Sequence, residues 1–264
     1  MSIQFDRLLS TDSAKAAKAT GYGYLNGIHY MAPHSTAGVG DLCPASTDGC
    51  RALCLGLYSG QASMVADLEN GTNSVRESRI EKARLFMGER AFYLNHLARQ
   101  IVRLVAKASR EGLRPCIRLN GSTDIAFERM AFALDAKTAK ATGRNAGERV
   151  TLPGLFAGVQ FVDYTKIASR LANAPSNLCL TLSRSEANEP ECLAALANGQ
   201  NVAVVFAHGL PVSRLWEGFR VVDGDKHDLR HLDPRDASSG FVIGLSPKGA
   251  KAKRDMSGFV LRDY

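Results

Sequence analysis

The fold is decided by residues 158–206, GVQFVDYTKIASRLANAPSNLCLTLSRSEANEPECLAALANGQNVAVVF. Three short apolar runs alternate in this stretch with two patterns typical of helices. The runs are apolar almost throughout, which indicates strands that are buried on both faces of a parallel sheet. Gly199 stands where a glycine is expected at the carboxyl end of the second helix.

The same alternation continues in both directions along the chain. Further strands are expected at YLNGIHYM (24–31), CIRLN (116–120), FRVVDG (219–224) and GFVIGLS (240–246). Helices are expected at residues 74–86, 92–108, 124–134, 165–174 and 190–199. The second of these places apolar side chains along one helical face, namely Leu97, Ile101, Leu104, Val105 and Ala108.

Repeated βα units predict right-handed crossovers and a parallel sheet. The fold class is therefore expected to be α/β, as a partial or complete parallel βα barrel of the TIM type. No linker divides the chain, so residues 1–264 are expected to form one domain. The polar stretch 135–150 is expected to be an excursion from the barrel.

The composition, 45% hydrophobic and 22% charged over 264 residues, is that of a folded protein with one large core. No apolar run reaches the roughly 18 residues of a membrane span, so no membrane partner is expected. The N-terminal segment lacks the apolar core of a signal peptide. We therefore expect a cytoplasmic protein whose thiols stay reduced and are free to bind metal.

The net charge of +7 permits an anionic partner. Basic residues concentrate in residues 76–110, in AKTAKATGRNAGER (136–149) and in KGAKAKRD (248–255). One interpretation is a set of solvated helix faces with a flexible loop; the other is a surface that contacts nucleic acid. The sequence has no exposed aromatics interleaved with these charges, so it gives little sign of base stacking.

Three cysteines lie in the loop 41–60, in a C-x6-C-x3-C pattern formed by Cys43, Cys50 and Cys54. An odd number of thiols is a poor disulfide set, but three thiolates suit an iron–sulfur cluster with one iron open to the site. A zinc ion would need a fourth ligand, for which His34 is the only close histidine. Free thiols in a turn are the remaining interpretation.

Polar side chains follow nearly every expected strand, and in a βα barrel such positions build the site. We expect catalytic roles for Asn120, Asp124, Asp163 and Lys166, and binding of a small-molecule cosubstrate by Ser122, Ser183, Glu186 and Asp223. The first strand leads directly into the cysteine loop, so these groups would share one mouth with the cluster. The competing interpretation is that they are helix caps and turn formers.

Eight segments occur in order along the chain: LCPASTDGCRALCLGLYSGQA, RIEKARLF, RLNGSTDIAFE, FVDYTK, LTLSRSE, NVAVVFAH, VVDGDKHDLRHLDP and GLSPKGAKAKRDMSGFV. Together they resemble the phage gene product 88 family, whose members occur in phages, plasmids and related mobile elements. The resemblance covers residues 24–260. The family has no settled biochemical activity, so the resemblance implies an order of motifs more than a function.

A partial βα barrel with three cysteines after its first strand also looks like the radical S-adenosylmethionine enzymes. That distant resemblance implies a [4Fe–4S] cluster and S-adenosylmethionine as cosubstrate. It places residues 120–124 where an amine-binding segment belongs, and Ser183 and Glu186 near the ribose or the carboxylate. The cysteine spacing departs from the usual C-x3-C-x2-C, which puts cleavage of S-adenosylmethionine in doubt.

Three functions stay open from the sequence. The first is a radical-SAM-like enzyme of a phage or mobile element. The second is a nucleic-acid-associated accessory protein with a structural or redox-sensing cluster, which would need a continuous basic surface. The third is a zinc protein closed by His34.

Overall fold

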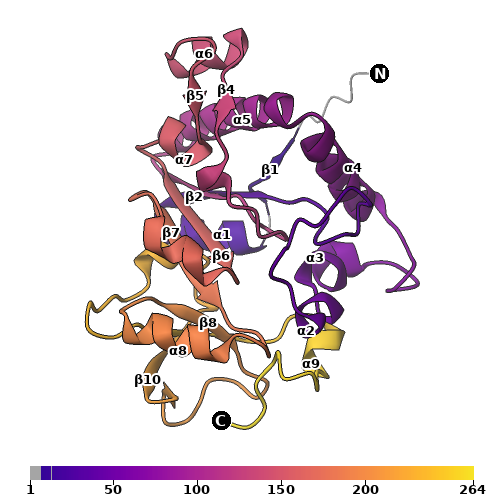
Figure 1. The fold of residues 1–264 in the computed structure, drawn as a ribbon, viewed down its shortest axis with the longest axis vertical. Coiled ribbons are helices and arrows are strands. Elements are labelled where there is room, and N and C mark those ends of the chain that lie inside the picture. Colours follow the sequence, from indigo (N-terminus) through magenta and orange to yellow (C-terminus); the bar gives the residue numbers. More distant parts are fainter. Residues whose placement is uncertain (1–6, 13) are drawn as a thin grey trace.

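The computed structural model describes residues 7–12 and 14–264, which form a mixed α/β fold around one large sheet (Figure 1). Within this part of the chain the sheet has nine strands in the order β1-β2-β3-β6-β7-β8-β11-β10-β9. The seven central strands run parallel, and only the short strands at the two edges are antiparallel to their neighbours. The mostly parallel sheet is therefore confirmed, whereas closure into a barrel is not shown.

Each apolar run that predicted a strand lies in this sheet. The strands are β1 (Leu9–Ser10), β2 (Tyr24–His29), β3 (Arg114–Arg118), β6 (Gln160–Thr165), β7 (Leu178–Ser183), β8 (Val202–Val205), β9 (Leu215–Trp216), β10 (Phe219–Asp223) and β11 (Val242–Leu245). Strands β4 (Phe132–Ala133) and β5 (Arg149–Val150) form a separate antiparallel pair. In Figure 1 this pair and α6 (Ala136–Thr142) project from the rest of the fold, where the polar excursion is expected.

Three of the expected helices are present as α4 (Ser74–Gly88), α5 (Arg90–Arg110) and α8 (Glu189–Ala197). Gly199 follows α8 with φ 75°, a left-handed conformation that suits glycine. The remaining helices are short: α1 (Ala14–Thr20), α2 (Asp48–Ala52), α3 (Leu55–Tyr58), α7 (Leu152–Leu155) and α9 (Ala250–Lys253). Nowhere in the described chain does a helix combine the length and apolar character needed to cross a bilayer.

Two helix predictions were wrong. Residues 124–134 contain only the 3-10 turn η2 (Phe127–Arg129) and strand β4, and residues 165–174 contain the 3-10 helix η3 (Ala168–Asn173). In the first segment Ile125 and Phe127 are buried, as are Phe132 and Leu134. This spacing of two is that of extended chain, and it buries side chains that an α-helix would separate.

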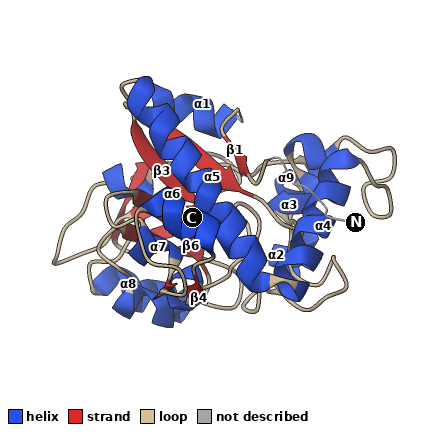
Figure 2. Ribbon diagram, turned by 90° about the horizontal axis from the view of Figure 1, so that it is seen from above, coloured by secondary structure: helices blue, strands red, loops and turns tan. Residues whose placement is uncertain are grey.

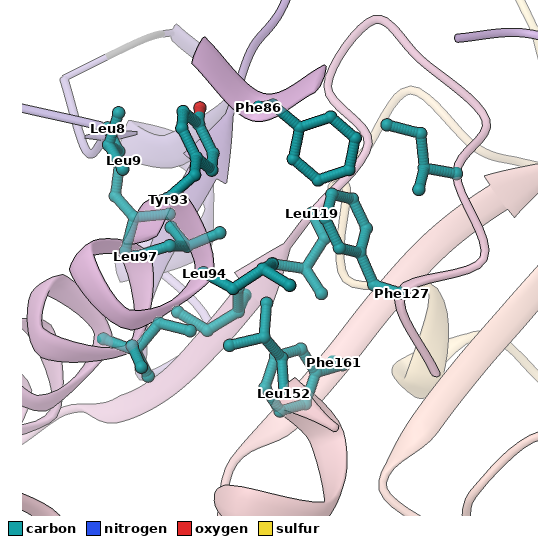
Figure 3. Packing of buried hydrophobic residues seen from close by; sticks show 14 of the residues in the cluster. Leu8, Leu9, Phe86, Tyr93, Leu94, Leu97, Leu119, Phe127, Leu152 and Phe161 are labelled. Carbon is teal, nitrogen blue, oxygen red and sulfur yellow. The ribbon is translucent and has the colours of Figure 1, made fainter. Parts of the chain in front are cut away.

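The main core lies between the sheet and the long helices. Helix α5 buries Tyr93, Leu94 and Leu97 on one face, and Figure 3 shows them packed near Phe127 and Phe161. At Gly27 in β2 an added Cβ would lie 2.3 Å from Leu104 Cδ1, so a larger residue would displace the Leu104 side chain of α5. A second core packs α8 against β7, β8 and β11.

The opposite face of the sheet is covered by α1, whose Ala19 packs against Tyr24 and Cys116, and by a long irregular segment. Residues 225–236, which we call the crossing segment, connect β10 to β11. The ring of His227 lies 4.7 Å from that of Tyr22, and Arg118 Nη1 lies 2.8 Å from Asp228 Oδ2. The segment therefore starts beside the last parallel strand and reaches back to the first.

We expect Arg118→Leu to lower the free energy of unfolding by about 3–5 kcal/mol, because it leaves the buried Asp228 carboxylate without its cation. Urea unfolding monitored by circular dichroism measures this loss. The matched control is Arg220→Leu, whose partner Asp236 is exposed; it should cost about 1 kcal/mol or less. Equal effects of the two substitutions would contradict the assignment.

Candidate functional site

The cysteine loop takes its shape from two short helices that follow β2. Thr47 is the N-cap of α2, and its hydroxyl accepts the N–H of Cys50 at 3.2 Å. Cys54 occupies the N-cap position of α3. Helix α9 lies beside these two helices in Figures 1 and 2, and Lys251 of α9 is ion-paired with Glu69. Lys251 also lies over the ring of Tyr58, so α9 contacts the end of the cysteine loop.

The three thiols lie within electrostatic reach of one another. All of them are free. Burial raises the pKa of Cys43 to about 12, and negative charge on Cys54 or Cys50 would raise it further. Burial likewise raises the pKa of Cys54 to about 11, with a further contribution from Cys50. A positive ion or centre among them would relieve this mutual repulsion.

Backbone amides lie near two of these cysteines. The N–H of His34 donates to Cys43 Sγ at 3.2 Å, and His34 adopts a left-handed φ of 36°. The N–H groups of Gly56 and Leu57 in the first turn of α3 lie close enough to lower the pKa of Cys54, although they form no hydrogen bond with its side chain. Amides in this position stabilise thiolate over thiol.

No group of three or more His, Cys, Asp or Glu side chains in the described chain is arranged to hold a metal ion. The chemistry of the donor set fits an iron–sulfur cluster, but the thiols are not preassembled around one point. His34 contacts Cys43 through its backbone, and its imidazole lies 3.5 Å from Ser35. His34, the close histidine considered as a fourth zinc ligand, therefore meets Cys43 through its backbone N–H.

Both carboxylate oxygens of Asp124 accept hydrogen bonds from other parts of the protein. One of its oxygens accepts the backbone N–H of Lys166 at 2.8 Å, and the other accepts Arg170 at 2.5 Å. Its own backbone N–H donates to Leu42 in the cysteine loop at 2.9 Å. It therefore joins the carboxyl ends of β3 and β6 to the loop that carries Cys43.

Asn120 and Asp163 form a closed buried network. The Asn120 amide donates to Asp163 at 2.8 Å and to Ile125, and its carbonyl oxygen accepts Thr123 and the backbone of Ile125. Burial raises the pKa of Asp163 to about 7, against the lowering effect of Arg118. These contacts use the capacity of the Asn120 side chain, which argues for a structural role.

Two predicted residues contact the cysteine region directly. Ser122 donates through Oγ to Met31 at 2.6 Å, and its carbonyl oxygen accepts Cys43 Sγ at 3.7 Å. Lys166 donates to Ser183 Oγ at 3.3 Å, and its positive charge lowers the pKa of Cys54. The carboxyl ends of β3, β6 and β7 therefore come together beside the thiols.

Glu186 connects the end of β7 to α2. Its Oε1 accepts the N–H of Gly49 at 2.7 Å, whereas Oε2 is buried and has no hydrogen-bond partner in the described residues. A Cβ at Gly49 would lie 2.7 Å from Oε1, so the contact depends on glycine at this position. Of the predicted carboxylates, Glu186 thus retains a free acceptor.

Asp223 lies apart from this group. It ends β10, which five strands separate from β2, and it accepts the N–H of Asp225 at 2.9 Å. Part of the expected basic surface is neutralised, since Lys248 and Lys251 pair with Asp225 and Glu69. These contacts give no support to one continuous patch.

Sequence reasoning missed the two arginines that organise the region. Arg76 donates to the carbonyls of Ala62, Gly71, Leu57 and Leu68, and Arg170 joins Asp124 to Glu128. Both are nearly fully buried. Residues 76–110 suggested solvated basic faces, and no pattern around Arg76 or Arg170 distinguished a buried guanidinium from an exposed one.

We expect Asn120→Ala to destabilise the protein by about 2–4 kcal/mol, because it leaves at least two buried polar groups without partners. Urea unfolding measures the change, and the slope of the unfolding free energy against urea concentration should stay constant. Asn198→Ala, which removes an exposed bond to Ala194, is the control and should cost less than about 1 kcal/mol. If Asn120→Ala is as stable as the wild type, the structural role is contradicted and Asn120 is again a candidate for binding or catalysis.

Comparison with curated protein sequences and with solved structures gives no match. The family model described as gene product 88 matches residues 6–263. The match covers nearly the whole chain, including the cysteine loop, the strand ends around it and the crossing segment. The protein therefore belongs to the gene product 88 family.

Proposed function

We propose that the protein is an iron–sulfur enzyme in which Cys43, Cys50 and Cys54 hold a [4Fe–4S] cluster. The observation that carries this proposal is the set of three free thiols that act on one another electrostatically, one of which accepts the backbone N–H of His34. Thiolates held in this way suit iron, whose clusters are bound by cysteine and tuned by N–H groups near sulfur. A zinc ion finds less support, since His34 donates its backbone N–H to Cys43 and its imidazole Nδ1 lies 3.5 Å from Ser35 Oγ.

The residues around the three cysteines can support a cluster even though the thiols are not already arranged around one point. Lys166, fixed at its backbone by Asp124 and at its ammonium by Ser183, places a positive charge near Cys54. Such a charge favours the thiolate that a metal requires. The N–H of Gly49 in α2 donates to Glu186, which follows β7. This hydrogen bond helps to fix the position of the neighbouring Cys50 relative to the sheet.

We extend the proposal to a radical-SAM-like reaction on a small molecule. A cluster with three protein ligands leaves one iron open and supplies one electron to a bound cosubstrate. The sequential parallel order of β2, β3, β6, β7 and β8, with the thiols after β2, supports a partial-barrel arrangement. Glu186 Oε2, buried without a partner in the described residues, is the acceptor available to a polar group of that cosubstrate.

Anaerobically purified protein should contain iron and acid-labile sulfide, with broad absorption near 400 nm. Replacement of Cys43, Cys50 or Cys54 by Ala should each lower the iron content at least about tenfold, because loss of a direct ligand exceeds the cost of losing outer-shell support. Cys192→Ala, a buried thiol on α8, is the matched control and should keep its iron. Colourless protein with stoichiometric zinc would reject the cluster.

Reduced, reconstituted protein should convert S-adenosylmethionine to 5′-deoxyadenosine, measured by liquid chromatography. Glu186→Gln keeps the acceptor for Gly49 but removes the charge, and we expect it to lower this conversion by about tenfold while the iron content stays constant, since a charged hydrogen bond is lost. Arg220→Gln serves as an exposed control. Iron-loaded protein that never yields 5′-deoxyadenosine would restrict the cluster to a structural or redox role.

A further inference from the structure

A cavity of about 450 Å³ lies between the cysteine loop and helix α4. Its walls include Pro33, His34, Arg51, Tyr58, Arg76 and Arg79. The volume falls within the range of about 300–1,000 Å³ that small-molecule sites occupy. The residues proposed above for the cosubstrate, Ser183 and Glu186, do not line it.

Three arginines line the cavity, and carboxylates balance the charge of only one of them, since Arg51 pairs with Asp41 at 3.2 Å. Within the described residues neither Arg76 nor Arg79 forms an ion pair with a carboxylate, and Arg76 is only 7% exposed. The one acid in the wall, Glu69, is already occupied by Lys251 and by the Tyr58 hydroxyl at 3.1 Å. Burying cations without counter-charges is costly, and an anion would offset this cost.

Arg79 presents the donors that such an anion needs. Its Nη1 donates to the Gly56 carbonyl, and its guanidinium lies over the Tyr30 ring at 4.8 Å. Its Nε and Nη2 have no hydrogen-bond partner in the described part of the chain. These two atoms form one edge of a planar guanidinium and can donate in parallel to two oxygens of one group.

The amino end of helix α4 adds to the positive electrostatic potential in the cavity. Gly71 and Thr72 line the cavity directly before this 15-residue helix, and Arg76 lies in its first turns. Asn73 caps the helix by accepting the N–H of Arg76 at 3.0 Å. The amino end of a helix carries partial positive charge, which favours an anion placed next to it.

We propose that this cavity binds a small molecule through a phosphate or carboxylate group, whose paired oxygens accept Nε and Nη2 of Arg79. The site goes beyond the iron–sulfur function, because it requires no cluster. It shares a wall with the cysteine loop, since Gly56 contacts Arg79 and follows Cys54 by two residues. Occupation of the cavity would therefore stabilise the conformation of α3.

Isothermal titration calorimetry with the protein as purified tests the site, using ADP in one arm and citrate in the other. The iron content of each sample is measured alongside. We expect one equivalent of ADP or of citrate to bind. Arg79→Gln should weaken that binding about ten- to a hundredfold, the equivalent of one charged hydrogen-bond pair. Arg79→Lys should recover only part of it, because an ammonium cannot donate in the same fork.

Ala52→Trp provides a second variant, because it fills the cavity from an exposed wall position and removes no side-chain hydrogen bond. It should abolish binding even if Arg79→Gln fails to fold. Arg103→Gln on the exposed face of α5 is the control and should bind as the wild type does. Binding of ADP alone assigns a phosphate ligand, and binding of citrate alone a carboxylate ligand.

Absence of binding in both arms, or undiminished binding by Arg79→Gln and Ala52→Trp, would overturn this site. Neither result would bear on the cluster, which is judged from the iron and sulfide content. Conversely, protein without iron that still binds ADP or citrate would keep the anion site while the iron–sulfur proposal fails. The two proposals are thus separable in one set of samples.

Discussion

The structure depends on the pairing of charges that are buried between the open sheet and the crossing segment. Arg118 in β3 reaches Asp228 in that segment at 2.8 Å, and its guanidinium also lies over the Tyr164 ring. Neither charge would be stable there alone, because each has lost its water. The requirement for a partner therefore fixes the path of residues 225–236 across the sheet, and with it the connection from β10 to β11.

The same principle governs the end of the sheet beside the cysteines. Asp124 and Asp163 accept hydrogen bonds from Arg170, Lys166 and Asn120, so their oxygens hold strand ends in place rather than facing a ligand. What remains for chemistry is a smaller set: the three thiols, the ammonium of Lys166, and one oxygen of Glu186. The anion cavity behind α3 adds Arg79, whose neighbours satisfy only part of its donor capacity.

The sequence predicted the sheet well because its strands are continuous apolar runs. Such runs are typical of strands that are buried on both faces of a parallel sheet. It also predicted α5, in which Leu97 and Ile101 fall on one face. It failed at 124–134, where Asn120 binds the backbone of Ile125 and prevents the helix that the composition favours. The roles of Asp163 and Arg79 could not be predicted, since whether a polar side chain is satisfied depends on neighbours far away in the chain.

The position of strand β11 in the sheet affects how the chain folds during its synthesis. This strand follows β10 in sequence but lies between β8 and β10 in the sheet. Until residue 245 has left the ribosome, the edge of β8 stays unpaired and β10 has no parallel neighbour to join. Pairing between distant segments slows folding, and an open strand edge invites association with other chains. The nascent protein is therefore most exposed to aggregation and to chaperone capture late in its synthesis.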